Sequence, residues 1–414
     1  MKKNLNYIEI EGRSTGFYAL FGFFGLLVLA GLAATYYMEH NGHYVTGMTN
    51  QIVWGMPHVF ALFLIVAASG ALNVASISSV FGKKAYKPLA PLSVVTAIAL
   101  LAGGLMVLVL DLGRPDRLIV AMTEYNFKSI FAWNQMLYNG FFAVTIIYLW
   151  FMLERKMNKY SRYAGFAAFV WRLILTTGTG SIFGFLVARQ AYDAAIMAPM
   201  FVIMSFSFGL AIFILVTLAA YNGTKREIGD ATLIRMRKLL GTFVAAVLYF
   251  VIAFHITNLY ATEHHGIESF ILLGTNGGEI YSKLFWIVQI GIGSIVPLLL
   301  LLLPMFHKCR KTLTIASLLI IVGGFAQIYI ILIGGQAYPL QLFPGMEVTS
   351  SFFDGVTNSY TPSTPEILLG IAGVAVSMIL IMVLIKFLKI MPKSLADSIA
   401  DPHYVAESAD TASK

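Results

Sequence analysis

Ten long runs of apolar residues constrain the fold more than any other feature of the sequence. A helix needs about 20 largely apolar residues to cross the roughly 30 Å hydrocarbon core of a membrane. Strands of a membrane β-barrel would be shorter and would alternate in polarity. Because the runs are continuous, the sequence predicts an all-α integral membrane protein with ten transmembrane helices. The predicted helices cover residues 16–38, 52–80, 89–110, 131–153, 165–188, 198–221, 239–261, 283–303, 312–333 and 366–388.

Composition and charge agree with a chain embedded in lipid. Of its 414 residues, 58% are hydrophobic and only 12% are charged, whereas a soluble domain has about 25% charged residues. A soluble enzyme and a disordered chain are therefore excluded. The net charge of +8 does not indicate nucleic-acid binding, because 22 of the 28 lysines and arginines fall on one side of the alternating helices. Basic loops mark the cytoplasmic side of a membrane protein, so both termini are predicted to be cytoplasmic.

A faint internal repeat divides the predicted helices into two halves. The fifth helix leads into Gln190-Ala191-Tyr192, and the ninth leads into Gln336-Ala337-Tyr338. We predict two four-helix bundles, helices 2–5 in residues 52–192 and helices 6–9 in residues 198–338, flanked by the first and tenth helices. The membrane domain is expected to cover residues 1–391, with a mobile, polar cytoplasmic tail at 392–414.

The connection at residues 334–365 is long, lacks lysine and arginine, and carries four prolines and five aromatic residues. A loop of this length is either functional or disordered, and the aromatic residues favour an ordered cap.

Polar residues in and just beyond the apolar runs gather at the helix ends opposite the basic side. They are His58, Asp111, Arg114, Asn134, Tyr138, His255 and Glu263. Polar groups are costly inside a membrane, so their depth predicts one functional pocket near this face. A quinone suits such a pocket, because its carbonyl oxygens need hydrogen-bond donors and its two-electron reduction takes up two protons. We expect proton transfer from His58, Asp111, Arg114 and Glu263, and quinone binding by His58, Asn134, Tyr138, Arg114 and His255.

Each of these residues also has a structural interpretation. His58 could satisfy a carbonyl of a neighbouring helix, and Asp111 could form a local ion pair with Arg114. Glu263 with the adjacent His264 and His265 resembles a metal cluster, but adjacent histidines on a helix diverge by about 100° and do not share a metal. No metal site is predicted, and Glu263 is interpreted as a group that exchanges protons with water.

The cysteine and histidine content limits the redox chemistry. The single cysteine, Cys309, excludes an iron–sulfur cluster of four thiolates and a CxxCH haem-attachment motif. Only His58 and His255 lie convincingly within the membrane, so one bis-histidine haem stays open but is not favoured. The chain is expected to carry no haem and no iron–sulfur cluster, and to use a quinone, either menaquinone or ubiquinone.

The run Leu110-Asp111-Leu112-Gly113-Arg114-Pro115 resembles the signature of the NrfD/PsrC (polysulfide reductase membrane subunit) family. Further stretches resemble its DsrP branch, the membrane subunit of the DsrMKJOP sulfur-metabolism complex. They are residues 70–76, Trp133-Asn134 with Tyr138, residues 191–195 and residues 363–366. Within the family signature, Asp111 and Arg114 are the matching positions in this chain.

This resemblance implies a haem-free, quinone-reactive subunit of an oxidoreductase complex in a bacterial or archaeal cytoplasmic (inner) membrane. The implied partners are a periplasmic ferredoxin-like iron–sulfur subunit (DsrO-like), a multihaem cytochrome (DsrJ-like), and membrane and cytoplasmic subunits (DsrM- and DsrK-like), with lipid around them. Dissimilatory sulfur metabolism is the implied setting. A secondary transporter and a purely structural membrane anchor stay open as alternatives. A helix broken at Gly178-Thr179-Gly180 would favour transport.

Overall fold

The structure is a computed structural model that describes residues 6–306, 309–340 and 355–404. Ten helical spans in these residues are long and apolar enough to cross a membrane, which confirms the predicted fold class. The spans are Thr15–Asn41 (α1), Met56–Ser79 (α2, α3), Lys84–Leu110 (η2, α4), Ile130–Leu153 (α6), Asn158–Gly184 (η4, α7), Met197–Gly223 (α8), Asp230–Tyr260 (α9), Glu279–Leu302 (α11, η8, α12), Arg310–Ala337 (α13, η10, α14) and Thr364–Phe387 (α15).

Several spans combine more than one helical element. Short π-helical segments occur in the second half of the chain, where single π turns often accompany functional sites. The elements are α2 (Met56–Ala71), α3 (Asn73–Ser79), η2 (Lys84–Leu89), α4 (Ala90–Leu110), η4 (Asn158–Tyr160), α7 (Ser161–Gly184), α11 (Glu279–Lys283), η8 (Leu284–Ile295, π), α12 (Val296–Leu302), α13 (Arg310–Tyr329), η10 (Ile330–Gly334, π) and α14 (Gly335–Ala337).

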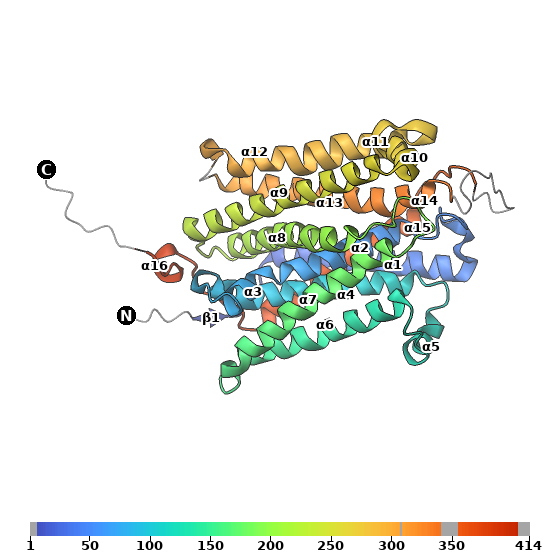
Figure 1. The fold of residues 1–414 in the computed structure, drawn as a ribbon. Coiled ribbons are helices and arrows are strands. Elements are labelled where there is room, and N and C mark those ends of the chain that lie inside the picture. The colour runs from blue at the N-terminus through green and yellow to red at the C-terminus, as the bar shows by residue number, and fades with distance from the viewer. Residues whose placement is uncertain (1–5, 307–308, 341–354, 405–414) are drawn as a thin grey trace, which may run out of the picture.

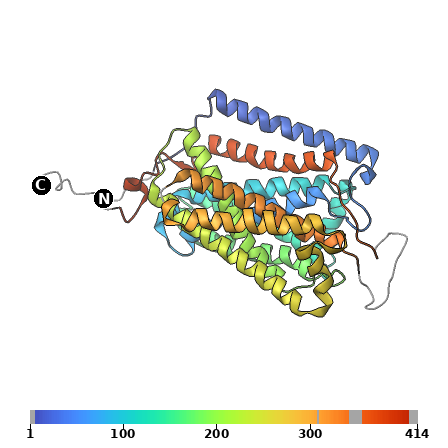
Figure 2. The ribbon, with the colours of Figure 1, turned by 90° about the horizontal axis from the view of Figure 1, so that it is seen from above.

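The spans form two groups around a shared centre (Figure 1). In the first group α2 packs on α4, and α6 packs on α7. In the second group α8 packs on α9, and α13 packs on η8 and α12. The central helices α2 and α8 join the two groups, while α15 packs on α4 and α2. Figure 2 shows α1 outside α15, at the edge of the molecule, and α1 buries few of its own residues.

The contact between α2 and α8 depends on glycine. A Cβ added to Gly70 would clash with the Ser205 carbonyl, and one added to Gly209 would clash with the backbone of Gly70 and Ala71. In membranes, where lipid is as apolar as leucine, such close backbone approach drives helix association. The two helices therefore cross at a separation that only a residue without a side chain permits.

Gly209→Val is expected to destabilise the protein by about 1–3 kcal/mol, because it overpacks this crossing. The measurement is thermal unfolding of the detergent-solubilised chain. Gly25→Val on α1 is the matched control, since a Cβ at Gly25 has no neighbour within 4 Å. Equal melting temperatures for the two variants would contradict this account of the crossing.

The first and the last residues that the structure describes lie at the same end of the bundle, which we call the terminal end (Figure 1). Strand β1 (Tyr7–Ile8) pairs antiparallel with β2 (Met391–Pro392), and Ile228 bridges to the buried Leu395. A short helix, α16 (Asp397–Ala400), follows, and η9 (Pro304–Phe306) also lies in a connection. Part of the segment 392–404 packs on the bundle: Leu395 is buried, and Asp401 pairs with Arg235 at 2.6 Å, whereas His403 and Tyr404 are exposed. Residues 405–414 lie outside the described residues.

Short helical elements make up the connections at the opposite end. They are η1 (His43–Val45), η3 (Pro115–Arg117), α5 (Leu118–Thr123), η5 (Thr262–His264), α10 (His265–Glu268), η6 (Ser269–Leu273, π) and η7 (Thr275–Gly277). The expected cap at 334–365 is described only at its two ends, since residues 341–354 lie outside the described residues. Helix α7 is continuous through Gly178-Thr179-Gly180 and ends at Gly184. The broken helix that would have favoured a transporter is therefore not formed.

Candidate functional site

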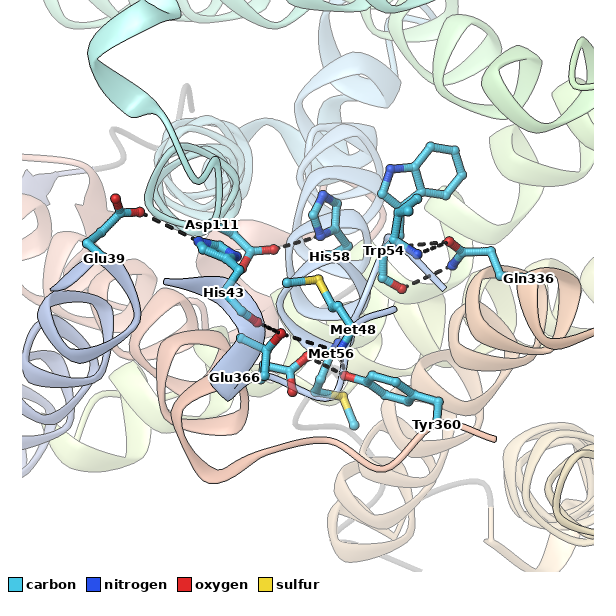
Figure 3. A network of polar contacts seen from close by, with 12 residues as sticks. Glu39, His43, Met48, Trp54, Met56, His58, Asp111, Gln336, Tyr360 and Glu366 are labelled. Atoms are coloured by element: carbon cyan, nitrogen blue, oxygen red, sulfur yellow. Dashed lines mark hydrogen bonds and ion pairs between the residues drawn. The ribbon is translucent and has the colours of Figure 1, made fainter. Parts of the chain in front are cut away.

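His58 and Asp111 meet at the opposite end of the bundle. His58 lies in the first turn of α2, after Pro57, and Asp111 caps the C-terminus of α4. The His58 Nδ1 lies 2.8 Å from the Asp111 Oδ2, with the Asp111 side chain fully buried and that of His58 23% exposed (Figure 3). Neither Asp111 oxygen accepts an aligned hydrogen bond from a residue that the structure describes. The close contact with His58 Nδ1 is therefore the polar contact that the described residues give this buried side chain.

This pair has the form of an acid–base dyad. A carboxylate at one ring nitrogen fixes the orientation of an imidazole and stabilises its protonated form. Since Nδ1 of His58 faces Asp111, Nε2 is the ring nitrogen left for a ligand or water. A partly exposed imidazole backed by a buried carboxylate can accept a proton at Nε2 and release it again.

A second buried carboxylate, Glu366, holds the start of α2 in place. Its side chain is 0% exposed and accepts hydrogen bonds from Gly47 N at 2.8 Å, Ser363 N at 2.7 Å and the Tyr360 hydroxyl at 2.6 Å. The Tyr360 oxygen in turn accepts from Met56 N at 2.6 Å. Burial and the Glu366 carboxylate raise the pKa of the Tyr360 phenol, which stays protonated. The network ends two residues before His58 (Figure 3).

Gln336, in the second half of the chain, hydrogen-bonds to the backbone directly before α2. Its Oε1 accepts from Val53 N and Trp54 N at 3.0 Å each, and its Nε2 donates to Trp54 O at 3.0 Å. Arg189 donates to the carbonyls of Gln336 and Gln51 at 2.9 and 2.8 Å. Arg189, which directly precedes the first Gln-Ala-Tyr segment, therefore contacts Gln336 of the second one beside the start of α2.

A second histidine–carboxylate pair lies between α9 and α10. The His255 Nδ1 is 2.6 Å from the Glu268 Oε2, and Asn258 Nδ2 donates to the Glu268 Oε1 at 2.9 Å. Glu268 is only 1% exposed, and the rings of Phe254 and Phe285 flank His255. Sequence reasoning missed Glu268; the available signal was a carboxylate directly before the apolar run 269–273.

Asn134 and Tyr138 cross-link α6 to α7. The Asn134 amide donates to the carbonyls of Gly178 at 3.0 Å and Ile130 at 2.9 Å, and the Tyr138 hydroxyl lies 3.5 Å from the Thr179 hydroxyl. Asn134 and Tyr138 thus join two neighbouring helices. The structure places neither of these two side chains in contact with His58. The Trp54 ring, 6.1 Å from that of Phe131 and 6.0 Å from that of Phe183, connects α2 with this helix pair.

Arg114 and Glu263 lie on the surface of the same end. Arg114 forms a two-pronged pair with Asp116, at 3.0 Å for both contacts. The hydrogen bond from Arg114 lowers the pKa of Asp116. The local Asp111–Arg114 ion pair that the sequence left open is therefore not formed, because Arg114 turns outward. Glu263 is exposed in η5.

The histidines beside Glu263 have separate contacts. The His264 Nδ1 lies 2.9 Å from Gln190 O, and the His265 Nε2 lies 2.8 Å from Leu259 O. Among the residues that the structure describes, no three histidine, cysteine or acidic side chains converge as metal ligands would.

Fold and site together define a ten-span helical membrane protein in which two histidines contact buried carboxylates near one face. The family model "Polysulphide reductase, NrfD" matches residues 44–339. The chain belongs to this family, as its Asp-Leu-Gly-Arg-Pro motif predicted.

Curated relatives cover nearly the whole chain. The Hdr-like menaquinol oxidoreductase integral membrane subunit of Archaeoglobus fulgidus is 28% identical, over 96% of this chain and 99% of the relative. A protein of Halobacterium salinarum, provisionally named as a membrane subunit of dimethyl sulfoxide reductase, is 26% identical over 89% and 90%. A subunit of the selenate reductase of Mesobacillus selenatarsenatis is 22% identical over 81% and 84%.

Proposed function

We propose that the chain is the quinone-interacting membrane subunit of a respiratory oxidoreductase complex. The observation that carries this proposal is the His58–Asp111 dyad, a proton acceptor at the membrane end with a buried carboxylate behind it. Oxidation of a quinol to a quinone releases two electrons and two protons, and the reverse reaction takes up both. His58 Nε2 is assigned as the group that exchanges one of these protons with the quinone oxygen.

The relatives support the same interpretation. One is named as a membrane subunit of a menaquinol oxidoreductase, and the other two are named as subunits of reductases. We favour a quinone of the menaquinone or ubiquinone type, and the first of these names supports menaquinone. With one cysteine in the chain, the electrons pass to or from a metal centre in a partner subunit. We propose an iron–sulfur partner of the DsrO type and a cytochrome of the DsrJ type, with DsrM- and DsrK-like subunits, in dissimilatory sulfur metabolism.

The basic residues at the terminal end support an orientation with both termini in the cytoplasm, in the cytoplasmic (inner) membrane. His58 then lies near the periplasmic face, and the connections η1, η3 and η5 face the partner subunits. His43, whose Nε2 lies 3.7 Å from the Glu39 Oε1, packs beside Gly113 and offers a path for protons to this face. Glu263 offers a second, exposed proton-exchange group. The pair His255–Glu268 is kept as a further candidate for quinone contact.

The test uses the purified complex. Organic extraction should yield a quinone with its ultraviolet spectrum, and a quinol analogue should reduce the partner's metal centre. In proteoliposomes with a trapped pH probe, protons are expected to appear at the His58 face. Absence of quinone together with solute uptake by the chain alone would support the transporter. Assembly and quinone-coupled turnover that survive loss of His58 would support the structural anchor.

A further inference from the structure

A large cavity opens at the terminal end and extends along α2 as far as Phe60, two residues beyond His58. Its volume is about 1660 Å³, beyond the roughly 300–1,000 Å³ of pockets for small molecules. It lies between α1, α2, α8, α13 and α15. The deep walls are apolar, and among the lining side chains are Phe60, Phe63, Val216, Phe325 and Met378. The rings of Phe60 and Phe63 pack on Phe325, with centroids 4.7 and 5.9 Å apart. Such walls suit hydrocarbon rather than a polar solute.

The mouth of the cavity has a different character. Four basic residues line it, together with two acidic ones. The basic residues are Arg13, Lys225, Arg226 and Lys393, and the acidic residues are Glu11 and Glu227. The net charge of this rim is therefore positive. It lies at the basic end of the bundle, where a headgroup at the membrane surface would be found.

Arg226 is the most informative residue of the rim. Its Nη2 donates to the backbone oxygen of Glu9 at 2.9 Å. Its Nη1 is buried and has no hydrogen-bond partner among the residues that the structure describes. A buried guanidinium nitrogen without an acceptor is costly, and phosphate and carboxylate oxygens are the acceptors that match the planar fork of arginine. The rim thus contains a guanidinium with one unsatisfied donor.

We propose that this cavity holds an anionic phospholipid. Its acyl chains lie along the apolar walls between α1 and α13, and its headgroup phosphate binds Arg226, Arg13 and Lys393. Basic pockets between transmembrane helices at the cytoplasmic side are suited to anionic headgroups. A quinone fits less well, because its uncharged ring would leave the four basic residues of the rim without an anionic partner. A partner's helix fits less well, because it would leave the rim charges and Arg226 Nη1 uncompensated.

The bound lipid also completes the packing of α1. This helix contacts mainly α15 and the connection η1, and its residues Phe17, Leu20 and Phe24 line the cavity. Acyl chains in the cavity would join α1 to α8 and α13 across a space that side chains leave open. Removal of the lipid is therefore expected to lower the stability of the chain.

The test compares lipid retention in the full-length chain and in the variant Arg13→Gln/Arg226→Gln/Lys393→Gln. After exchange into mild detergent, mass spectrometry should find anionic phospholipid on the unchanged protein. The variant should retain at least about tenfold less, since each 1.4 kcal/mol of lost headgroup interaction corresponds to a factor of ten. Phosphatidylglycerol added to delipidated protein should raise its melting temperature, and phosphatidylcholine should not. The matched control is Lys83→Gln/Lys84→Gln/Lys156→Gln, which removes three exposed charges outside the cavity lining and should keep the lipid.

A second variant provides an independent test in case the triple charge variant misfolds. Val216→Trp fills the apolar part of the cavity without changing the rim, and it should also lose the lipid. Equal retention by all variants, retention of neutral lipid instead, or equal stabilisation by inorganic phosphate would overturn the proposal. So would a partner helix cross-linked into the cavity of the purified complex.

Discussion

Asp111→Asn is expected to lower quinol-coupled electron transfer by about 10²–10⁴-fold, the range over which positioned acid–base groups act. Asparagine has nearly the size of aspartate, so the end of α4 should keep its shape. It carries no charge, so it cannot stabilise the imidazolium that His58 becomes when it accepts a proton. The measurement is turnover with a quinol analogue in proteoliposomes, at matched amounts of assembled complex.

The control lies five residues further along the chain. Asp116 is exposed and paired with Arg114, and an exposed ion pair contributes little. Asp116→Asn should therefore turn over like the unchanged protein. If Asp111→Asn does the same, Asp111 has no part in the chemistry.

A double variant tests whether His58 and Asp111 act as one unit. The loss for His58→Gln/Asp111→Asn should be no larger than for His58→Gln alone, because groups that act together are not additive. Additive losses would mean that the 2.8 Å contact is structural and that the two residues act separately.

The membrane fold was predictable because hydropathy and helix length depend only on neighbours in the sequence. All ten runs became spans, and the main differences are at their ends. The seventh was predicted to begin at residue 239, but α9 begins at Asp230. The added turns contain Arg237, whose guanidinium donates to the carbonyls of Leu300 and Cys309 at 2.8 and 2.6 Å. From the sequence alone, Arg237 resembles a loop residue, because the carbonyls that satisfy its guanidinium belong to distant residues of the chain.

The candidate site was predictable only in part. Depth placed His58 and Asp111 at the same end, and the structure brings them into contact. The same reasoning included Arg114, a charged residue on the side with few basic residues, but depth says nothing about the direction of a side chain. Asn134 was in the right layer, yet its amide hydrogens are bonded to the carbonyls of Ile130 and Gly178.

The two buried glutamates show where sequence reasoning stops. Ser363 and Glu366 have the spacing of a capping box, and in the structure the Glu366 carboxylate accepts from Ser363 N at 2.7 Å. That motif predicts a helix start, but not that the carboxylate is buried against Gly47, 319 residues away in the chain. Glu268 has the same difficulty, since its burial depends on His255 and Asn258 from the preceding span.

Glu366→Ala is expected to destabilise the protein by about 3 kcal/mol or more, because each buried group left without its partner costs about 1–3 kcal/mol. Three donors lose their acceptor: Gly47 N, Ser363 N and the Tyr360 hydroxyl. Glu366→Gln retains one acceptor oxygen, so its stability should lie between that of Glu366→Ala and that of the unchanged protein. Thermal unfolding in detergent measures the effect, and Glu263→Ala is the control, since Glu263 is exposed at the same end.

The same substitution should also reduce turnover, because the network reaches His58 through the backbone. Tyr360 accepts from Met56 N, and His58 follows two residues later in the first turn of α2. Once Glu366 is lost, Tyr360 loses the carboxylate that fixes its hydroxyl, and the Nδ1–Oδ2 contact is expected to loosen although Gln336 and Arg189 still hold the segment before α2. Turnover at a temperature where Glu366→Ala is still folded should fall, and Glu366→Gln should restore part of it. A stable, folded Glu366→Ala protein with full turnover would show that the dyad is positioned by α4 alone.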